Sequence, residues 1–191
     1  MNILKMIGKQ IIGLGFIAIC LLQTTVCDGQ PEVFEKKNAF YVEALGNARL
    51  VSANYERIFN QSGNMKTAIR LGYGFWKVQY GGENFNNSML PLELNSLIGN
   101  KQHHLEIGFG TTVNFEKIRP MFYSGFGEVH TVSYLSYHGR IGYRYQKPTG
   151  GLLFRASFTP FYSRDYSFTT GKNDYEKRFY PWVGLSVGYA F

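Results

Sequence analysis

The sequence predicts an all-β fold, a closed antiparallel up-and-down barrel of eight transmembrane strands, and three observations support it. Residues 179–191 alternate between bulky apolar and small side chains as far as a terminal aromatic residue. Seven segments upstream show the same period of two, which is the side-chain spacing of a strand with two different faces. No apolar run after residue 27 is long enough to span a bilayer as a helix. A weak alternating signal of this kind is typical of barrels that cross a membrane.

Residues 1–27 predict a secretory signal peptide. Lys5 and Lys9 supply a positive start, and the apolar run 11–22 is too short for a spanning helix. A lipoprotein acylated at Cys27 is the competing interpretation, although Val26 stands where a small residue is expected. We therefore expect a signal peptide at 1–27, a periplasmic lead at 28–38 and one barrel domain at 39–191.

The eight strands are predicted from alternation and from the turn residues between them. Most are near the ten or so residues that a tilted strand needs to cross the bilayer. Their ranges are 39–46, 48–59, 65–76, 88–98, 103–115, 129–145, 151–163 and 179–191.

The connections alternate in length, as they must if one end of the barrel faces the periplasm and the other faces outward. Short turns are predicted at 60–64, 99–102 and 146–150, and longer outer loops at 77–87, 116–128 and 164–178, with a tight first outer turn at 46–48. Proline cannot donate to a strand ladder. We accordingly place Pro91, Pro160 and Pro181 at the outer rim and none in the middle of a strand.

The predicted inward face carries most of the charged residues of the strands. They form the expected lumen charge network, Glu43, Glu56, Arg70, Glu93, Glu106, His138, Arg140, Arg144 and Arg155, joined by Asn54, Asn95 and Asn114. An eight-stranded barrel has an interior about one side chain wide. Because unpaired buried charge is costly, the balance of four carboxylates against four guanidiniums favours a self-neutralising polar plug over an ion-conducting lumen.

The last strand supplies a candidate assembly signal. Its apolar face consists of Val183, Leu185, Val187, Tyr189 and Phe191. Outer-membrane barrels routinely end on such a strand, which the barrel assembly machinery reads, so that machinery is an expected partner.

Catalysis and metal binding find little support in the sequence. His130 or His138 with Ser133 or Ser136 and a nearby carboxylate could form a lipid-processing set, but a triad is recognised by geometry and not by a loose pair. Adjacent strand residues point to opposite faces, so His103 and His104 are not expected to share a metal ion. The chain has no CxxC, phosphate loop or nucleophile elbow. We expect no enzyme activity, no cofactor and no metal, and keep a lipid-modifying barrel enzyme as the alternative.

The formal net charge of +7 suits anionic headgroups or lipopolysaccharide phosphates. No basic cluster indicates nucleic acid. The outer loops, rich in tyrosine and mixed charges, could bind a surface ligand or simply form the rim. A soluble lipocalin-like barrel would need an apolar lumen and a polar exterior, the inverse of the predicted facing.

Several segments resemble a family of small outer-membrane β-barrel proteins from Bacteroidota. They are 54–57, 91–94, 139–146, 153–160 and 181–191, within a resemblance that spans 39–191. The tyrosine-arginine-tyrosine strand at 143–145, followed by a proline-glycine turn and a Phe154-Arg155 strand, is the most specific combination. The resemblance implies the outer membrane of a Gram-negative bacterium as the location. It implies no catalytic residues.

Overall fold

The computed structural model describes residues 33–80, 83–118, 121–122, 125–126, 129–169 and 172–191. The predicted signal peptide, Cys20, Cys27 and residues 28–32 of the predicted lead lie outside the described residues. Among the residues that are described, no helix is long and apolar enough to cross a membrane.

The described residues form strands and one short 3-10 helix, η1. The elements are β1 (Asn38–Leu45), η1 (Gly46–Ala48), β2 (Val51–Ser62), β3 (Met65–Tyr80), β4 (Glu83–Asn100), β5 (His103–Ile118), β6 (Met121–Phe122), β7 (Gly125–Phe126), β8 (His130–Gln146), β9 (Gly151–Phe158), β10 (Phe161–Thr169), β11 (Lys172–Tyr180) and β12 (Val183–Ala190).

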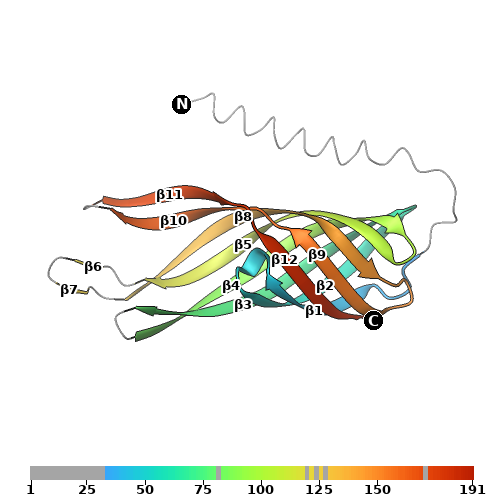
Figure 1. The fold of residues 1–191 in the computed structure, drawn as a ribbon, viewed down its shortest axis with the longest axis horizontal. Coiled ribbons are helices and arrows are strands. Elements are labelled where there is room, and N and C mark those ends of the chain that lie inside the picture. Colours follow the sequence, from blue (N-terminus) through green and yellow to red (C-terminus); the bar gives the residue numbers. More distant parts are fainter. Residues whose placement is uncertain (1–32, 81–82, 119–120, 123–124, 127–128, 170–171) are drawn as a thin grey trace, which may run out of the picture. The chain divides into compact units, whose positions relative to one another are not determined.

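Eight of these strands close into a barrel in the order β1-β2-β3-β4-β5-β8-β9-β12 and back to β1 (Figure 1). Closure runs through β1, where Val42 pairs with Ala53 of β2 on one side and with Val187 of β12 on the other. All neighbours are antiparallel and follow one another along the chain. The predicted closed eight-stranded antiparallel meander is confirmed.

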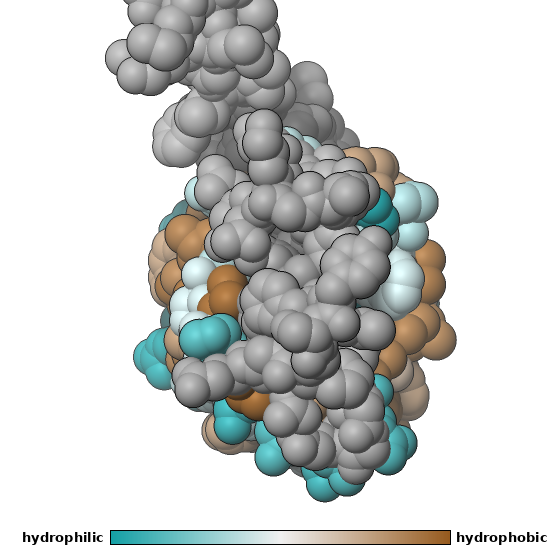
Figure 2. Space-filling view, turned by 90° about the vertical axis from the view of Figure 1, so that its left-hand side faces the viewer, coloured by the Kyte–Doolittle hydropathy of each residue, from teal (hydrophilic) through white to brown (hydrophobic). Residues whose placement is uncertain are grey.

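The two faces of the wall have opposite polarity. Inward positions of the strands are buried and mostly polar, whereas outward positions are exposed and apolar. The exposed apolar side chains include Phe40, Val42, Ile69, Leu71, Leu92, Leu94, Leu105, Phe109, Leu135, Ile141, Leu152, Phe154, Val183, Leu185 and Val187. Seen from one end, apolar surface flanks the barrel on both sides (Figure 2). The predicted facing of the strands agrees with this pattern, which places bulk outside and charge inside.

At one end of the barrel the strands are longer than predicted. β3 and β4 remain paired as far as Tyr80 and Glu83, and β10 and β11 as far as Thr169 and Lys172. Much of the predicted loops 77–87 and 164–178 is therefore hairpin, and β5 reaches Ile118 within the predicted loop 116–128. Continued pairing satisfies backbone donors and acceptors, and aromatic residues favour strands. We call this the hairpin end, and the opposite end, where β1 begins and β12 finishes, the terminus end.

Pro91 lies inside β4, so its predicted place at the rim is wrong. The strand continues outward from Pro91 to Glu83, and the β3–β4 register is interrupted between the pairs Leu71–Leu92 and Gly74–Met89. Gly72 makes room for the ring, because a Cβ there would lie 2.8 Å from Pro91 Cγ. Pairing on the β5 side is kept, with Pro91 opposite Thr112.

Pro160 and Pro181 lie at strand ends, as expected, but they divide two strands that were predicted as continuous. Pro160 separates β9 from β10, and Pro181 separates β11 from β12. The two breaks are adjacent, since the Thr159 N–H donates to the Trp182 carbonyl at 2.7 Å. Beyond them β10 pairs with β8 only at Phe161 and Tyr162. The β10–β11 hairpin therefore stands almost independent of the barrel wall.

Candidate functional site

The nine residues of the predicted charge network all lie buried in the barrel interior. They separate into two ion-pair clusters. Glu43, Arg70, Glu93 and Arg140 form the hairpin-end cluster, while Glu56, Glu106, Arg144 and Arg155 form the terminus-end cluster. His138 joins the first. Each cluster contains two carboxylates and two guanidiniums, so each is formally neutral.

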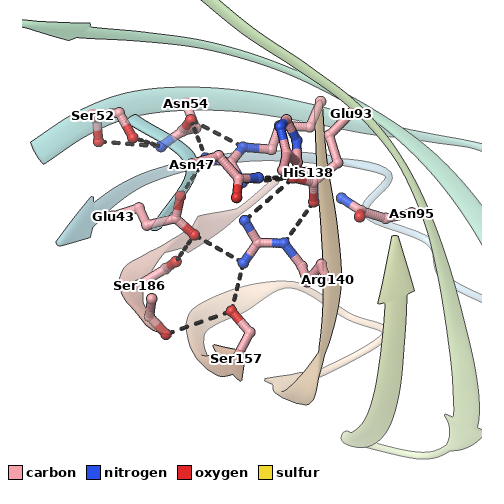
Figure 3. Close-up of polar contacts among 12 residues, drawn as sticks. Glu43, Asn47, Ser52, Asn54, Glu93, Asn95, His138, Arg140, Ser157 and Ser186 are labelled. Atoms are coloured by element: carbon pink, nitrogen blue, oxygen red, sulfur yellow. Dashed lines mark hydrogen bonds and ion pairs between the residues drawn. The ribbon is translucent and has the colours of Figure 1, made fainter. Parts of the chain in front are cut away.

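Glu93 is the centre of the hairpin-end cluster (Figure 3). Its carboxylate lies 2.6 Å from Arg140 Nε, 3.3 Å from Arg70 Nη1 and 3.0 Å from His138 Nε2. Glu43 completes the set by pairing with Arg70 and with Arg140 Nη1, the latter at 2.9 Å. Charges removed from water remain stable only with such complete pairing.

Neutral side chains saturate the rest of this cluster. Asn54 Oδ1 accepts from Arg70 Nε at 3.0 Å, and Ser157 Oγ accepts from Arg140 Nη1 at 2.6 Å. The Ser186 hydroxyl donates to Glu43 Oε1 at 3.3 Å. These partners come from β2, β9 and β12, so the network connects strands that are distant in the sequence.

The terminus-end cluster is built on a similar plan. Glu56 pairs with Arg144 and, at 3.0 Å, with Arg155 Nη2. Glu106 lies 2.7 Å from Arg155 Nε but 3.8 Å from Arg144 Nη1. Glu106 is therefore held by fewer and longer contacts than Glu93.

Tyr41 lies between the two clusters. Its ring centroid is 4.5 Å from the Arg155 guanidinium carbon and 5.6 Å from that of Arg70. Its hydroxyl donates to Glu56 Oε2 at 3.3 Å and accepts from Arg155 Nη1 at 3.0 Å. One aromatic ring thus separates and contacts both groups of charges.

Small inward residues make space for the large charged ones. A Cβ at Gly110 would lie 2.7 Å from His138 Nε2, and Gly110 itself sits opposite His138 on β8. Gly46, with φ +64°, lies so close to the Glu43 carboxylate that a Cβ there would collide with it. Glycine at these two positions is therefore required by close approach and, at Gly46, by backbone conformation.

The helix η1 folds inward over the hairpin-end cluster. Asn47 is buried and donates from Nδ2 to Glu93, and its carbonyl accepts from Thr112 Oγ1 at 3.4 Å. Leu45 and Arg49 flank η1 with φ +61° and +63°. Backbone strain of this kind persists only where surroundings hold it. The tight predicted turn is thus a cap on the lumen.

Arg49 forms a second layer above the cap. Its guanidinium bonds to Glu116 Oε1 at 3.1 Å and to the Tyr134 hydroxyl at 2.9 Å. It also lies 5.4 Å from the Trp76 ring centroid and 5.9 Å from that of Phe161. Side chains from four strands therefore converge on one residue of the first turn.

The terminus end is closed by a layer of buried side chains around Phe34. Phe34, in the segment before β1, is fully buried and packs with Ile58, Ala68 and Leu97. Reciprocal hydrogen bonds hold it: the Phe34 N–H donates to Gln61 Oε1 at 2.7 Å, and Gln61 Nε2 donates to the Phe34 carbonyl at 3.1 Å. Phe34, in the described part of the predicted periplasmic lead, therefore fills the terminus end of the barrel interior.

The candidate catalytic residues do not assemble. Both nitrogens of His138 are engaged, Nε2 with Glu93 at 3.0 Å and Nδ1 with Thr112 Oγ1 at 3.4 Å. Ser136 instead accepts from Asn114 Nδ2 at 3.0 Å. His130 and Ser133 are exposed at the hairpin end. No hydrogen bond between His138 and Ser136 occurs among the described contacts.

His103 and His104 point to opposite faces, as the alternation requires. His103 is exposed and its Nδ1 lies 2.6 Å from the Tyr143 hydroxyl, whereas His104 is buried beside Phe34, with ring centroids 5.2 Å apart. No group of three or more candidate metal-ligating side chains gathers within the described part of the chain.

Sequence reasoning did not single out Tyr41, Asn47, Arg49 or Phe34. For Tyr41 a signal was present, because the alternation of the first strand places it inward with Glu43. Asn47 belongs to a turn and Phe34 to the segment before the first strand, where no periodicity applies. Arg49 lies within the predicted strand 48–59, but β2 begins only at Val51, so the alternation does not apply to Arg49. These side chains outside the strands turn inward because the barrel is closed around them. Alternation along one strand does not predict this.

Comparisons with known proteins give similarity in fold at low identity. No protein-family model matches the chain, and no curated protein matches it. Among solved structures, the N-terminal β-barrel domain of OprF from Pseudomonas aeruginosa is 13% identical, with a TM-score of 0.42, over 81% of this chain and 96% of that one. Ail, the attachment invasion locus protein of Yersinia pestis, solved with the heparin analogue sucrose octasulfate, is 16% identical, with a TM-score of 0.44, over 81% and 94%. Values this low support no inference about the function of this chain.

Proposed function

We propose that the chain is an integral outer-membrane β-barrel of a Gram-negative bacterium, without an open pore, that anchors surface hairpins in a structural or surface-interaction role. The observation that carries the proposal is the inverse polarity of the wall. Exposed apolar side chains encircle the barrel, and charged side chains are buried inside. A barrel in water would bury the first set, and only lipid suits it outside.

We propose no open pore because three layers of side chains fill the described interior one after another. Asn47 caps the hairpin-end cluster, the two ion-pair clusters fill the middle, and Phe34 closes the terminus end. An eight-stranded barrel is only wide enough for side chains to fill it. Conduction would require both neutral clusters to separate in a medium of low dielectric, which is costly.

The hairpins provide the surface role in this proposal. With the terminus end in the periplasm, β3–β4 and β10–β11 project outward beyond the closed wall. They are free of lipid contact and of barrel closure, and extended elements on a rigid scaffold commonly carry binding. The surface ligand is a prediction without a named partner.

The resemblance to small outer-membrane barrels of Bacteroidota supports the same location. The proposed assembly signal, which ends at Phe191, fits it as well. Phe191 stacks on Phe40 with centroids 5.7 Å apart, and its N–H donates to the Asn38 carbonyl at 2.8 Å. Packing and signalling are therefore compatible roles for this residue. The expectation that the chain is not an enzyme stays a prediction.

The test is folding and conductance in membranes. The protein should partition with the outer membrane and migrate differently on gels before and after boiling, because a barrel with every edge paired resists detergent until heated. In planar bilayers it should show no steady conductance. Extraction by buffer alone with identical gel mobility refutes the membrane location, and stable channels refute the closed lumen.

A further inference from the structure

A groove runs along the outer surface of the barrel at the terminus end, beside the β8–β9 turn. Its volume is about 600 Å³. The walls are apolar and aromatic, formed by Tyr145, Leu152, Phe154 and Tyr189, and Lys147 stands at its end. All of these lie on the outward face of the wall, apart from Lys147 in the turn.

The β8–β9 turn and the segment before β1 add polar groups near Lys147. Gly150 and Gly151 line it, and a Cβ placed on Gly151 would meet nothing within 4 Å, so this part is open. Lys36 lies against Gly150, since a Cβ there would be 2.8 Å from Lys36 Cγ. The Lys36 N–H donates to the Pro148 carbonyl at 3.2 Å, which fixes its chain segment beside the turn. Two exposed lysines therefore flank the polar end.

The surrounding rim has the same sign of charge. Its exposed basic side chains are Lys36, Lys37, Arg57, Lys101 and Lys147, and among the described acidic side chains of this end Glu35 is the one that is exposed. Lysine at a membrane surface attracts anionic lipid, and tyrosine is enriched at the interface between headgroups and chains. The rim therefore complements a layer of anionic headgroups.

We propose that this groove binds an anionic phospholipid of the periplasmic leaflet, with its phosphate between Lys36 and Lys147 and one acyl chain along Leu152 and Phe154. The site deepens the proposed function and rests on it, because it requires a membrane around the wall and the terminus end in the periplasm. The occupant follows from the combination of basic side chains at one end and apolar walls along the groove. A free phosphate would use only the lysines, and a zwitterionic lipid would gain little from them.

The experiment uses the full mature chain, purified in detergent, freed of lipid and examined by native mass spectrometry. Phosphatidylglycerol and phosphatidylcholine with identical acyl chains are titrated separately. The test variant is Lys36→Gln/Lys147→Gln. The matched control is Lys77→Gln/Lys117→Gln, which removes the same charge from exposed lysines on the hairpin side. We expect phosphatidylglycerol to bind the parent tightly and the test variant about tenfold more weakly, with the control unchanged.

Three outcomes overturn the proposal. They are equal binding of the two lipids by the parent, equal loss in both double variants, and displacement of bound lipid by inorganic phosphate at matched concentration. Gel mobility before and after heating is recorded for every variant. A folded, heat-modifiable barrel without lipid preference refutes the groove alone. A chain that never partitions into membranes refutes the proposed function instead.

Discussion

The hairpin-end and terminus-end clusters each contain two carboxylates and two guanidiniums but differ in their neighbours. Glu93 receives contacts from Arg70, Arg140 and His138, and also from Asn47 in the cap. Among the described residues, Glu106 pairs with Arg144 and Arg155, the first at 3.8 Å. Equal formal charge therefore does not mean equal importance. The hairpin-end cluster connects wall and cap, while the terminus-end cluster connects wall strands, since Glu56 also accepts from the Tyr41 hydroxyl and from Asn95 Nδ2.

The largest effect is expected when the better connected carboxylate loses its charge. Glu93→Gln leaves Arg70 and Arg140 to share Glu43 in a dry interior, and breaking a buried pair on one side costs about 3–5 kcal/mol. Urea unfolding of the barrel in lipid vesicles measures this loss. Glu116→Gln is the matched control, because Glu116 pairs with Arg49 at the partly exposed rim and should cost about 0–1 kcal/mol. Equal losses in the two variants would contradict the central place of Glu93.

A smaller effect is expected at the terminus end. Glu106→Gln removes a carboxylate with one close contact, and Glu56 still pairs with both Arg144 and Arg155. We expect a loss of about 1–3 kcal/mol in the free energy of unfolding, measured under the same conditions. If Glu106→Gln destabilises the barrel as much as Glu93→Gln, the number of partners does not set the importance of a lumen carboxylate.

The comparison also marks what the sequence could predict. Alternation gave the inward direction of all nine network residues, because direction depends only on position along a strand. It did not give their division into two clusters. That division follows from register around the barrel, which brings Glu43 of β1 to Arg140 of β8 although the two strands are not neighbours. Pro91 was placed at the rim because proline cannot donate to a strand ladder. That rule did not anticipate that Gly72 on the neighbouring strand leaves room for a proline inside β4.

The cap provides a third test, with an effect smaller still. Asn47→Ala removes the hydrogen bond from η1 to Glu93 but leaves the ion pairs of the cluster in place. We expect a loss of about 1 kcal/mol in the free energy of unfolding and no conductance in planar bilayers, because the ion pairs and Phe34 still close the lumen. Asn54→Ala removes a hydrogen-bond partner of Arg70 from the wall and controls for a general loosening of the cluster. Stable conductance in the Asn47→Ala variant would show that the cap, and not the ion pairs, closes the lumen.

The smallest effect on the stability of the barrel is expected from removal of the β10–β11 hairpin. Replacing 165–177 with a short Gly-Ser linker removes most of the β10–β11 hairpin, which contributes only the Phe161–His138 and Tyr162–Tyr137 pairs with β8, both outside the replaced segment. The free energy of unfolding should change by less than about 0.5 kcal/mol, and the difference in gel mobility on heating should remain. Any binding of the parent to host or envelope surfaces should be lost with the hairpin. Retained binding would move the interaction site to another surface, and a barrel that no longer folds would show that the hairpin helps to form the wall.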